Sequence, residues 1–137
     1  MRVETRARAR TLQAVYAWDM RGSAGNLERV ADEVWIDLAI APNVRALATP
    51  VLRAVARNLA EIDAQLADVT TNWRMERLGA VERCVLRVAA AELLLGATPP
   101  KVIIQEFVML TERFASAASA KFVNGVLDAL ARRMGRM

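Results

Sequence analysis

Hydrophobic residues recur at steps of three and four along nearly the whole chain, and this period returns side chains to one face of an α-helix. The clearest case begins at Thr49-Pro50, a capping residue followed by a proline suited to the first helical position, and continues to Val69. Glycine and proline interrupt the pattern only at spaced points, and the alternation typical of strands never extends over a long stretch. The pattern therefore predicts an all-α protein.

The interruptions divide the chain into six long helices and one short one. The predicted ranges are about 5–20, 27–39, 49–69, 73–78 (the short helix), 80–95, 100–114 and 116–134. We expect one compact bundle, with the loop around residues 40–48 separating two helical halves. The expected core face of helix 100–114 consists of Ile103, Phe107, Leu110 and Phe114.

A few residues that could suggest chemistry are more simply explained by packing. Trp18, Trp35 and Trp73 are expected in the core or between helices, and Cys84 is expected to be a buried apolar thiol. Gly125 interrupts a predicted helix at a cost of about 1 kcal/mol relative to alanine. The simplest reason for it is the close approach of another backbone.

Composition excludes several classes of protein. With 137 residues of which 55% are hydrophobic, the chain is too apolar to be disordered and has the size of one domain. It has no apolar run near the ~20 residues of a membrane span and no apolar stretch behind its charged N-terminus like that of a signal peptide. One cysteine allows no intrachain disulfide, so we expect a cytoplasmic protein.

Residues and motifs typical of catalytic sites are few in this sequence. The chain has no histidine, which removes the commonest general base and, with one cysteine, effectively excludes a structural zinc site. No glycine-rich phosphate loop or nucleophile elbow is present. We therefore expect no enzyme activity, no metal and no cofactor.

Charge is concentrated at the N-terminus. The formal net charge is +4, and residues 1–10 hold four arginines against Glu4 alone. In helical projection Arg6, Arg10 and Gln13 fall within about 40° of one another, whereas Arg8 points elsewhere. Arginines at the positive end of a helix dipole repel it, so we expect this segment to be frayed until an anion such as RNA orders it. The alternative is that this segment is a solvated terminus and that its arginines reflect a genome that favours arginine codons.

Two further segments leave a binding and a structural interpretation open. Phe122 lies about 100° from the expected buried face of its helix, beside Lys121, an arrangement in which a base can stack while the cation meets a phosphate. The alternative is that Phe122 covers a neighbouring helix, which is the commoner case. Glu82 lies in the first turn of its helix, where the dipole alone favours a carboxylate.

Taken together, these segments resemble the NusB family of bacterial transcription antitermination factors. The resemblance rests on RARARTLQAVYAW at 6–18, LGAVER at 78–83 and the helix after it, Pro100-Lys101-Val102 with Glu106, and KFVNGVLD at 121–128. It covers nearly the whole chain in the same order. The last motif matches at all eight positions and is the most specific.

The resemblance implies two packed helical halves without catalysis, acting over residues 1–137 as one RNA-binding domain. It implies binding to a boxA-type element of nascent ribosomal RNA together with the ribosomal protein NusE, within the transcribing RNA polymerase complex. The positions that match the family's RNA contacts are Arg6, Arg8, Arg10, Lys121 and Phe122. Those that match its NusE-facing surface are Tyr16 and Glu82.

Some questions stay open at this point. Residues 117–120 read Ala-Ala-Ser-Ala, where family members often carry an acidic or polar residue. Some members form homodimers, and the sequence does not decide this for the chain. One alternative is a NusB-like module of an RNA methyltransferase, which would need a catalytic domain for which 137 residues leave no room. Another is a helical oligomerisation protein with a basic tail.

Overall fold

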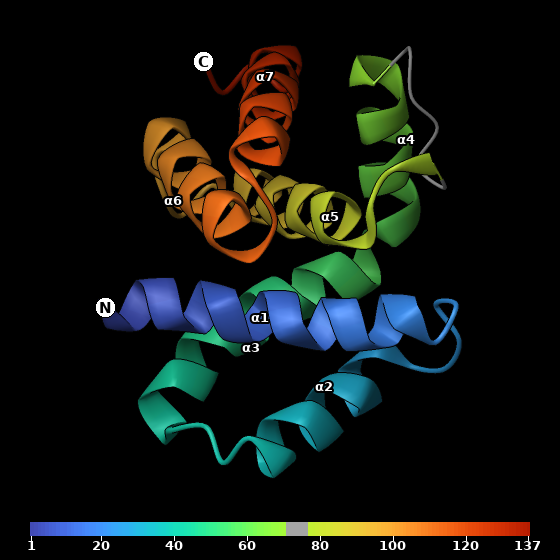
Figure 1. Cartoon of the computed structure of the whole chain (residues 1–137), viewed down its shortest axis with the longest axis vertical. Coiled ribbons are helices and arrows are strands. Elements are labelled where there is room, and N and C mark those ends of the chain that lie inside the picture. Colours follow the sequence, from blue (N-terminus) through green and yellow to red (C-terminus); the bar gives the residue numbers. More distant parts are fainter. Residues whose placement is uncertain (71–76) are drawn as a thin grey trace.

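The computed structural model describes residues 1–70 and 77–137 (Figure 1). Within these ranges the regular structure is helical and contains no strand, which confirms the predicted fold class. The elements are α1 (Val3–Met20), α2 (Leu27–Asp37), α3 (Pro42–Arg57), α4 (Leu59–Val69), α5 (Ala80–Leu95), α6 (Pro100–Phe114) and α7 (Ala117–Arg133).

The helices form two packed halves that meet along α1, α3 and α5. Figure 1 shows α1, α2 and α3 grouped in one half and α4 to α7 in the other. Helix α5 contacts five others, and every residue from Cys84 to Leu93 along it is buried. Its small residues, Ala89, Ala90 and Ala91, let neighbouring helices approach all its sides. The fold thus has one central helix that both halves share.

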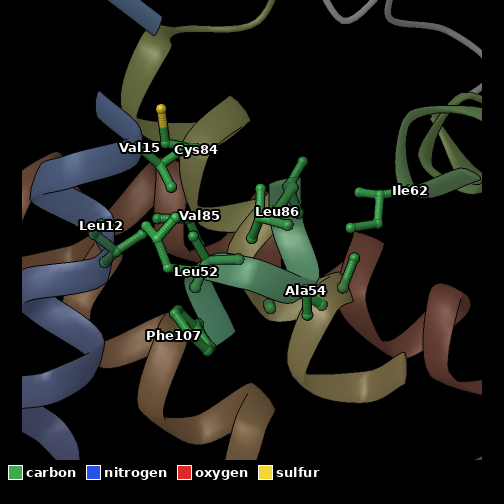
Figure 2. Packing of buried hydrophobic residues seen from close by; sticks show 14 of the residues in the cluster. Leu12, Val15, Leu52, Ala54, Ile62, Cys84, Val85, Leu86 and Phe107 are labelled. Carbon is green, nitrogen blue, oxygen red and sulfur yellow. The ribbon is translucent and has the colours of Figure 1, made fainter. Parts of the chain in front are cut away.

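The core lies where side chains from both halves converge on α5 (Figure 2). Leu12 and Val15 of α1 and Leu52 of α3 meet Val85 of α5 and Phe107 of α6, and all five are buried. Trp18 and Trp35 are also buried, as predicted, and their indole N–H groups donate to backbone oxygens. Trp73 and most of the predicted helix 73–78 lie outside the described residues.

The predicted helix 49–69 is wrong, because the structure has two helices there. Helix α3 already begins at Pro42, keeps Pro50 in its interior, and ends before Asn58. The Asn58 backbone turns (φ −118°, ψ 22°), and its side-chain nitrogen donates to the Ala54 oxygen at 2.9 Å. Val55 and Ile62 are both buried on either side of this turn, so the apolar period continues through it. The halves therefore separate at Asn58 and not at residues 40–48.

Within the residues that the structure describes, no helix combines the length and the apolar character needed to cross a membrane.

Candidate functional site

The basic segment of α1 is helical from Val3 onward, so the expected fraying is not observed. A carboxylate in the first turn offsets the dipole repulsion, since the pKa of Glu4 is lowered by a backbone hydrogen bond and by Arg2. Arg6 is exposed, and Arg10 is half-buried with its Nη1 donating to Gln13 Oε1 at 2.9 Å. The predicted outward stripe of Arg6, Arg10 and Gln13 is therefore present.

Arg8 points inward, and this corrects its assignment as an RNA contact. Its Nε and Nη2 donate to both carboxylate oxygens of Glu92 at 2.7 and 3.0 Å, and its Nη1 donates to Glu106 at 2.9 Å. Thr5 Oγ1 donates to the same Glu106 oxygen at 2.7 Å. Only 11% of the Arg8 side chain is exposed. These four residues, the Arg8 cluster, join α1 to α5 and α6 and leave the guanidinium occupied.

A second ionic cluster joins the other end of α1 to α5 and α4. Arg83 donates twice to the buried Asp19 carboxylate, at 2.8 and 2.6 Å. Arg87 reaches Asp19 at 3.4 Å and donates twice to Asp63 at 2.9 Å. The hydrogen bonds from Arg83 hold the pKa of Asp19 below its ordinary value. We call these four residues the Asp19 cluster; together the two clusters fix α1 along α5.

A shallow, mainly apolar hollow of about 310 Å³ lies between α1, α5 and the end of α6. Its lining consists of Ala9, Leu12, Gln13, Tyr16, Val81, Cys84, Val85 and Phe114. Tyr16 and Phe114 are 41% and 49% exposed. We call this the α1–α5 hollow. Its buried thiol, Cys84, is inert, because burial raises its pKa to about 12.

Phe114 was expected in the core with Ile103, Phe107 and Leu110. Those three residues are buried, but Phe114 is the last residue of α6, is half-exposed and lines the α1–α5 hollow. The helical period cannot show this, because it gives the direction of a side chain and not how far neighbouring helices cover the end of its helix. Phe114 is thus a surface residue that sequence reasoning missed.

A second hollow of about 280 Å³ lies between the first turns of α5 and α7. Its lining consists of Arg77, Leu78, Gly79, Glu82, Ala118, Ser119 and Phe122. We call this the α5–α7 hollow. Phe122 is half-buried and packs against the core, which confirms the packing interpretation, while one side of it lines the hollow. Its role in base stacking stays a prediction. Lys121 beside it is exposed.

The two hollows flank the first turn of α5. Val81 lines one and Glu82, the next residue, lines the other. Tyr16 therefore lies on one side of this turn, and Glu82 and Phe122 line the hollow on its other side. The outward stripe of α1 reaches the α1–α5 hollow through Gln13, which lines it.

Gly125 does not have the close backbone neighbour that was expected. It lies on the exposed side of α7, and a Cβ atom built there would meet nothing within 4 Å. The prediction of close packing at this position is wrong.

No group of three or more Cys, Asp or Glu side chains in the described part of the chain is placed to hold a metal ion.

Comparison with known proteins identifies the family of this chain. The family model described as "NusB family" matches residues 5–132. The chain belongs to the NusB family. The Transcription antitermination protein NusB of Sorangium cellulosum is 38% identical over 138 residues, a match that covers all of this chain and 97% of the relative. That of Anaeromyxobacter dehalogenans (strain 2CP-1) is 39% identical over 128 residues, covering 93% and 89%.

The fold of a solved NusB complex is also closely similar. In a crystal structure of the antitermination factors NusB and NusE in complex with dsRNA, a chain superimposes with a TM-score of 0.87 at 31% identity, covering 97% of this chain and 98% of that one. These relatives confirm the predicted role in transcription antitermination, and NusB proteins are non-enzymatic factors.

Proposed function

We propose that this chain binds a boxA-type RNA element together with NusE, acting over residues 1–137 as one RNA-binding domain within the transcribing polymerase complex. The observation that carries the proposal is that two hollows flank the first turn of α5, one lined by Gln13 of the outward α1 stripe and the other lined by Phe122.

The chemistry of the α1 stripe and of α7 suits an unpaired RNA strand. Guanidinium groups of Arg6 and Arg10 and the ammonium of Lys121 can meet phosphates, and the partly exposed Phe122 ring can stack on a base. A duplex keeps its base faces stacked, so a ring at this place favours a single strand.

The α1–α5 hollow suits a protein partner. Its lining is mostly apolar, and the half-exposed rings of Tyr16 and Phe114 are the kind of aromatic residues that anchor protein interfaces. Nothing in its lining carries a positive charge, which argues against a phosphate backbone there. We assign this hollow with its Tyr16, and Glu82 on the adjoining first turn of α5, to NusE.

The experiment is a fluorescence anisotropy titration with boxA-type RNA, a scrambled strand and a duplex of the same sequence, each with and without NusE. The proposal predicts the tightest binding for the boxA-type single strand, and tighter binding still with NusE. Equal binding of matched and scrambled strands in the presence of NusE would contradict it.

Self-association is the competing use of the same hollow. Sedimentation of the wild-type protein and of Tyr16→Ala over a range of concentrations distinguishes the two. If the α1–α5 hollow binds NusE, wild-type protein stays monomeric and Tyr16→Ala weakens NusE binding. If the hollow binds a second copy of the chain, wild-type protein forms a dimer that Tyr16→Ala abolishes.

A further inference from the structure

The first turns of α5 and α7 are joined by a chain of side-chain hydrogen bonds. Ser119 Oγ donates to Glu82 Oε1 at 2.6 Å across the α5–α7 hollow. Ser116, the N-cap of α7, accepts from the Ser119 backbone N–H and donates from its hydroxyl to Ser119 Oγ, both at 3.0 Å. The capped end of α7 is therefore tied to a carboxylate of α5.

Gly79 leaves space that the Glu82 carboxylate occupies. Gly79 has φ −60° and ψ 149°, a conformation open to any residue, so the backbone does not require glycine there. A Cβ atom at Gly79 would lie 2.0 Å from Glu82 Oε2. The absent side chain leaves room for the carboxylate, which is thus bounded by Gly79 on one side and hydrogen-bonded to Ser119 on the other.

This bond lies between the two proposed binding regions. Phe122 follows Ser119 by three residues and so lies on the next turn of the same side of α7. On α5, Val81 beside Glu82 lines the α1–α5 hollow. A partner seated in that hollow would pack against Val81 and so fix the first turn of α5, which carries Glu82 and its hydrogen bond to Ser119.

We propose that the Ser119–Glu82 hydrogen bond couples the two regions, so that NusE bound at the α1–α5 hollow holds the first turns of α7 in place for RNA. Ser119 acts as a positioning residue for Lys121 and Phe122 without touching RNA. Because such coupling is reciprocal, RNA binding strengthens NusE binding by the same factor. The inference rests on the proposed function and adds the route by which the two ligands cooperate.

The test measures RNA affinity with and without NusE for wild type, Ser119→Ala and Ser119→Thr. The gain in RNA affinity that NusE causes should fall by up to about tenfold in Ser119→Ala, which is the effect of losing one charge-assisted hydrogen bond. Ser119→Thr keeps the hydroxyl and should keep the gain. Thermal melting of each variant confirms that it is folded.

A second comparison separates this hydrogen bond from other effects of the serine. In a Glu82→Ala background, measured at NusE concentrations that saturate that variant, Ser119→Ala should cause no further loss of the gain, because the bond is already absent. Gly79→Ala, which displaces the carboxylate, should lower the gain as Ser119→Ala does. Equal losses from Ser119→Ala in both backgrounds would overturn the proposal.

The outcomes also separate this inference from the proposed function. Wild-type protein whose RNA affinity does not respond to NusE would contradict both. A wild-type gain that Ser119→Ala fully retains would overturn only the coupling and leave the proposed function standing.

Discussion

Arg8 and Arg6 lie two residues apart on α1, yet their environments are opposite. Arg8 is enclosed with Glu92 and Glu106, whereas Arg6 is exposed and has no side-chain hydrogen bond or ion pair among the described residues. The difference comes from the helix itself, which rotates neighbouring residues by about 100° each. An arginine-rich helical segment is therefore not a uniform RNA-binding element, because some of its positive charges serve the fold.

The largest expected effect is on stability and comes from removing the inward-facing Arg8 side chain. Arg8→Ala leaves the buried Glu92 and the nearby Glu106 without their cation, and loss of one partner from a buried ion pair costs about 3–5 kcal/mol. Urea unfolding should show a loss of this size. A loss no greater than that of Arg6→Ala would contradict the assignment of Arg8 to the fold.

Asp19→Asn tests the cluster at the other end of α1 and should have the next largest effect. The pKa of Asp19 is lowered in the folded protein, mainly by its hydrogen bonds to Arg83. The resulting stability is fully present above the ordinary carboxyl pKa of about 3.9 and is lost as the pH falls through the lower folded value.

The difference in free energy of unfolding between wild type and Asp19→Asn should therefore be constant near neutral pH and shrink in acid. It is measured by urea unfolding at a series of pH values. A difference that grows as the pH falls would show that the sign is wrong.

A substitution at Phe122 tests the proposed RNA-binding surface on α7. Phe122→Leu keeps an apolar side chain against the core but removes the ring, and loss of base stacking costs about 1–3 kcal/mol of RNA binding with little change in its salt dependence. Anisotropy titrations at two salt concentrations measure both quantities. Unchanged RNA affinity in a folded variant would show that Phe122 only covers the core.

The smallest effects are expected from the outward arginines. Arg6→Ala or Arg10→Ala should change the free energy of unfolding by less than about 0.5 kcal/mol. Each should lower the slope of log affinity against log salt by about 0.7, the value for one phosphate on a single strand. An unchanged slope for both variants would remove the α1 stripe from the RNA-binding surface.

The sequence predicts local features well where the helical period decides them. The outward stripe of Arg6 and Arg10 and the different direction of Arg8 both follow from it. The partners of Arg8 do not, because Glu92 and Glu106 lie 84 and 98 residues away and only the tertiary fold brings them together. The turn at Asn58 was missed because core-facing residues continue the period on both sides of it.

The surface region was only partly predictable for the same reason. Resemblance to the NusB family supplied Tyr16, Glu82 and Phe122, and the structure places them in the two hollows that flank the first turn of α5. Ser119 carries no sequence signal that points to Glu82, since their hydrogen bond joins two helix starts 37 residues apart. Phe114 was hidden by a helical period that continues to the exposed end of α6.

The most direct test of the central claim is photocrosslinking of a 4-thiouridine-substituted boxA-type RNA to the protein in the presence of NusE, with adducts located by mass spectrometry. The account predicts adducts on the outward side of α1 around Arg10 and on α7 at Lys121 and Phe122. Adducts confined to α2 and α3, with none on α1 or α7, would contradict it.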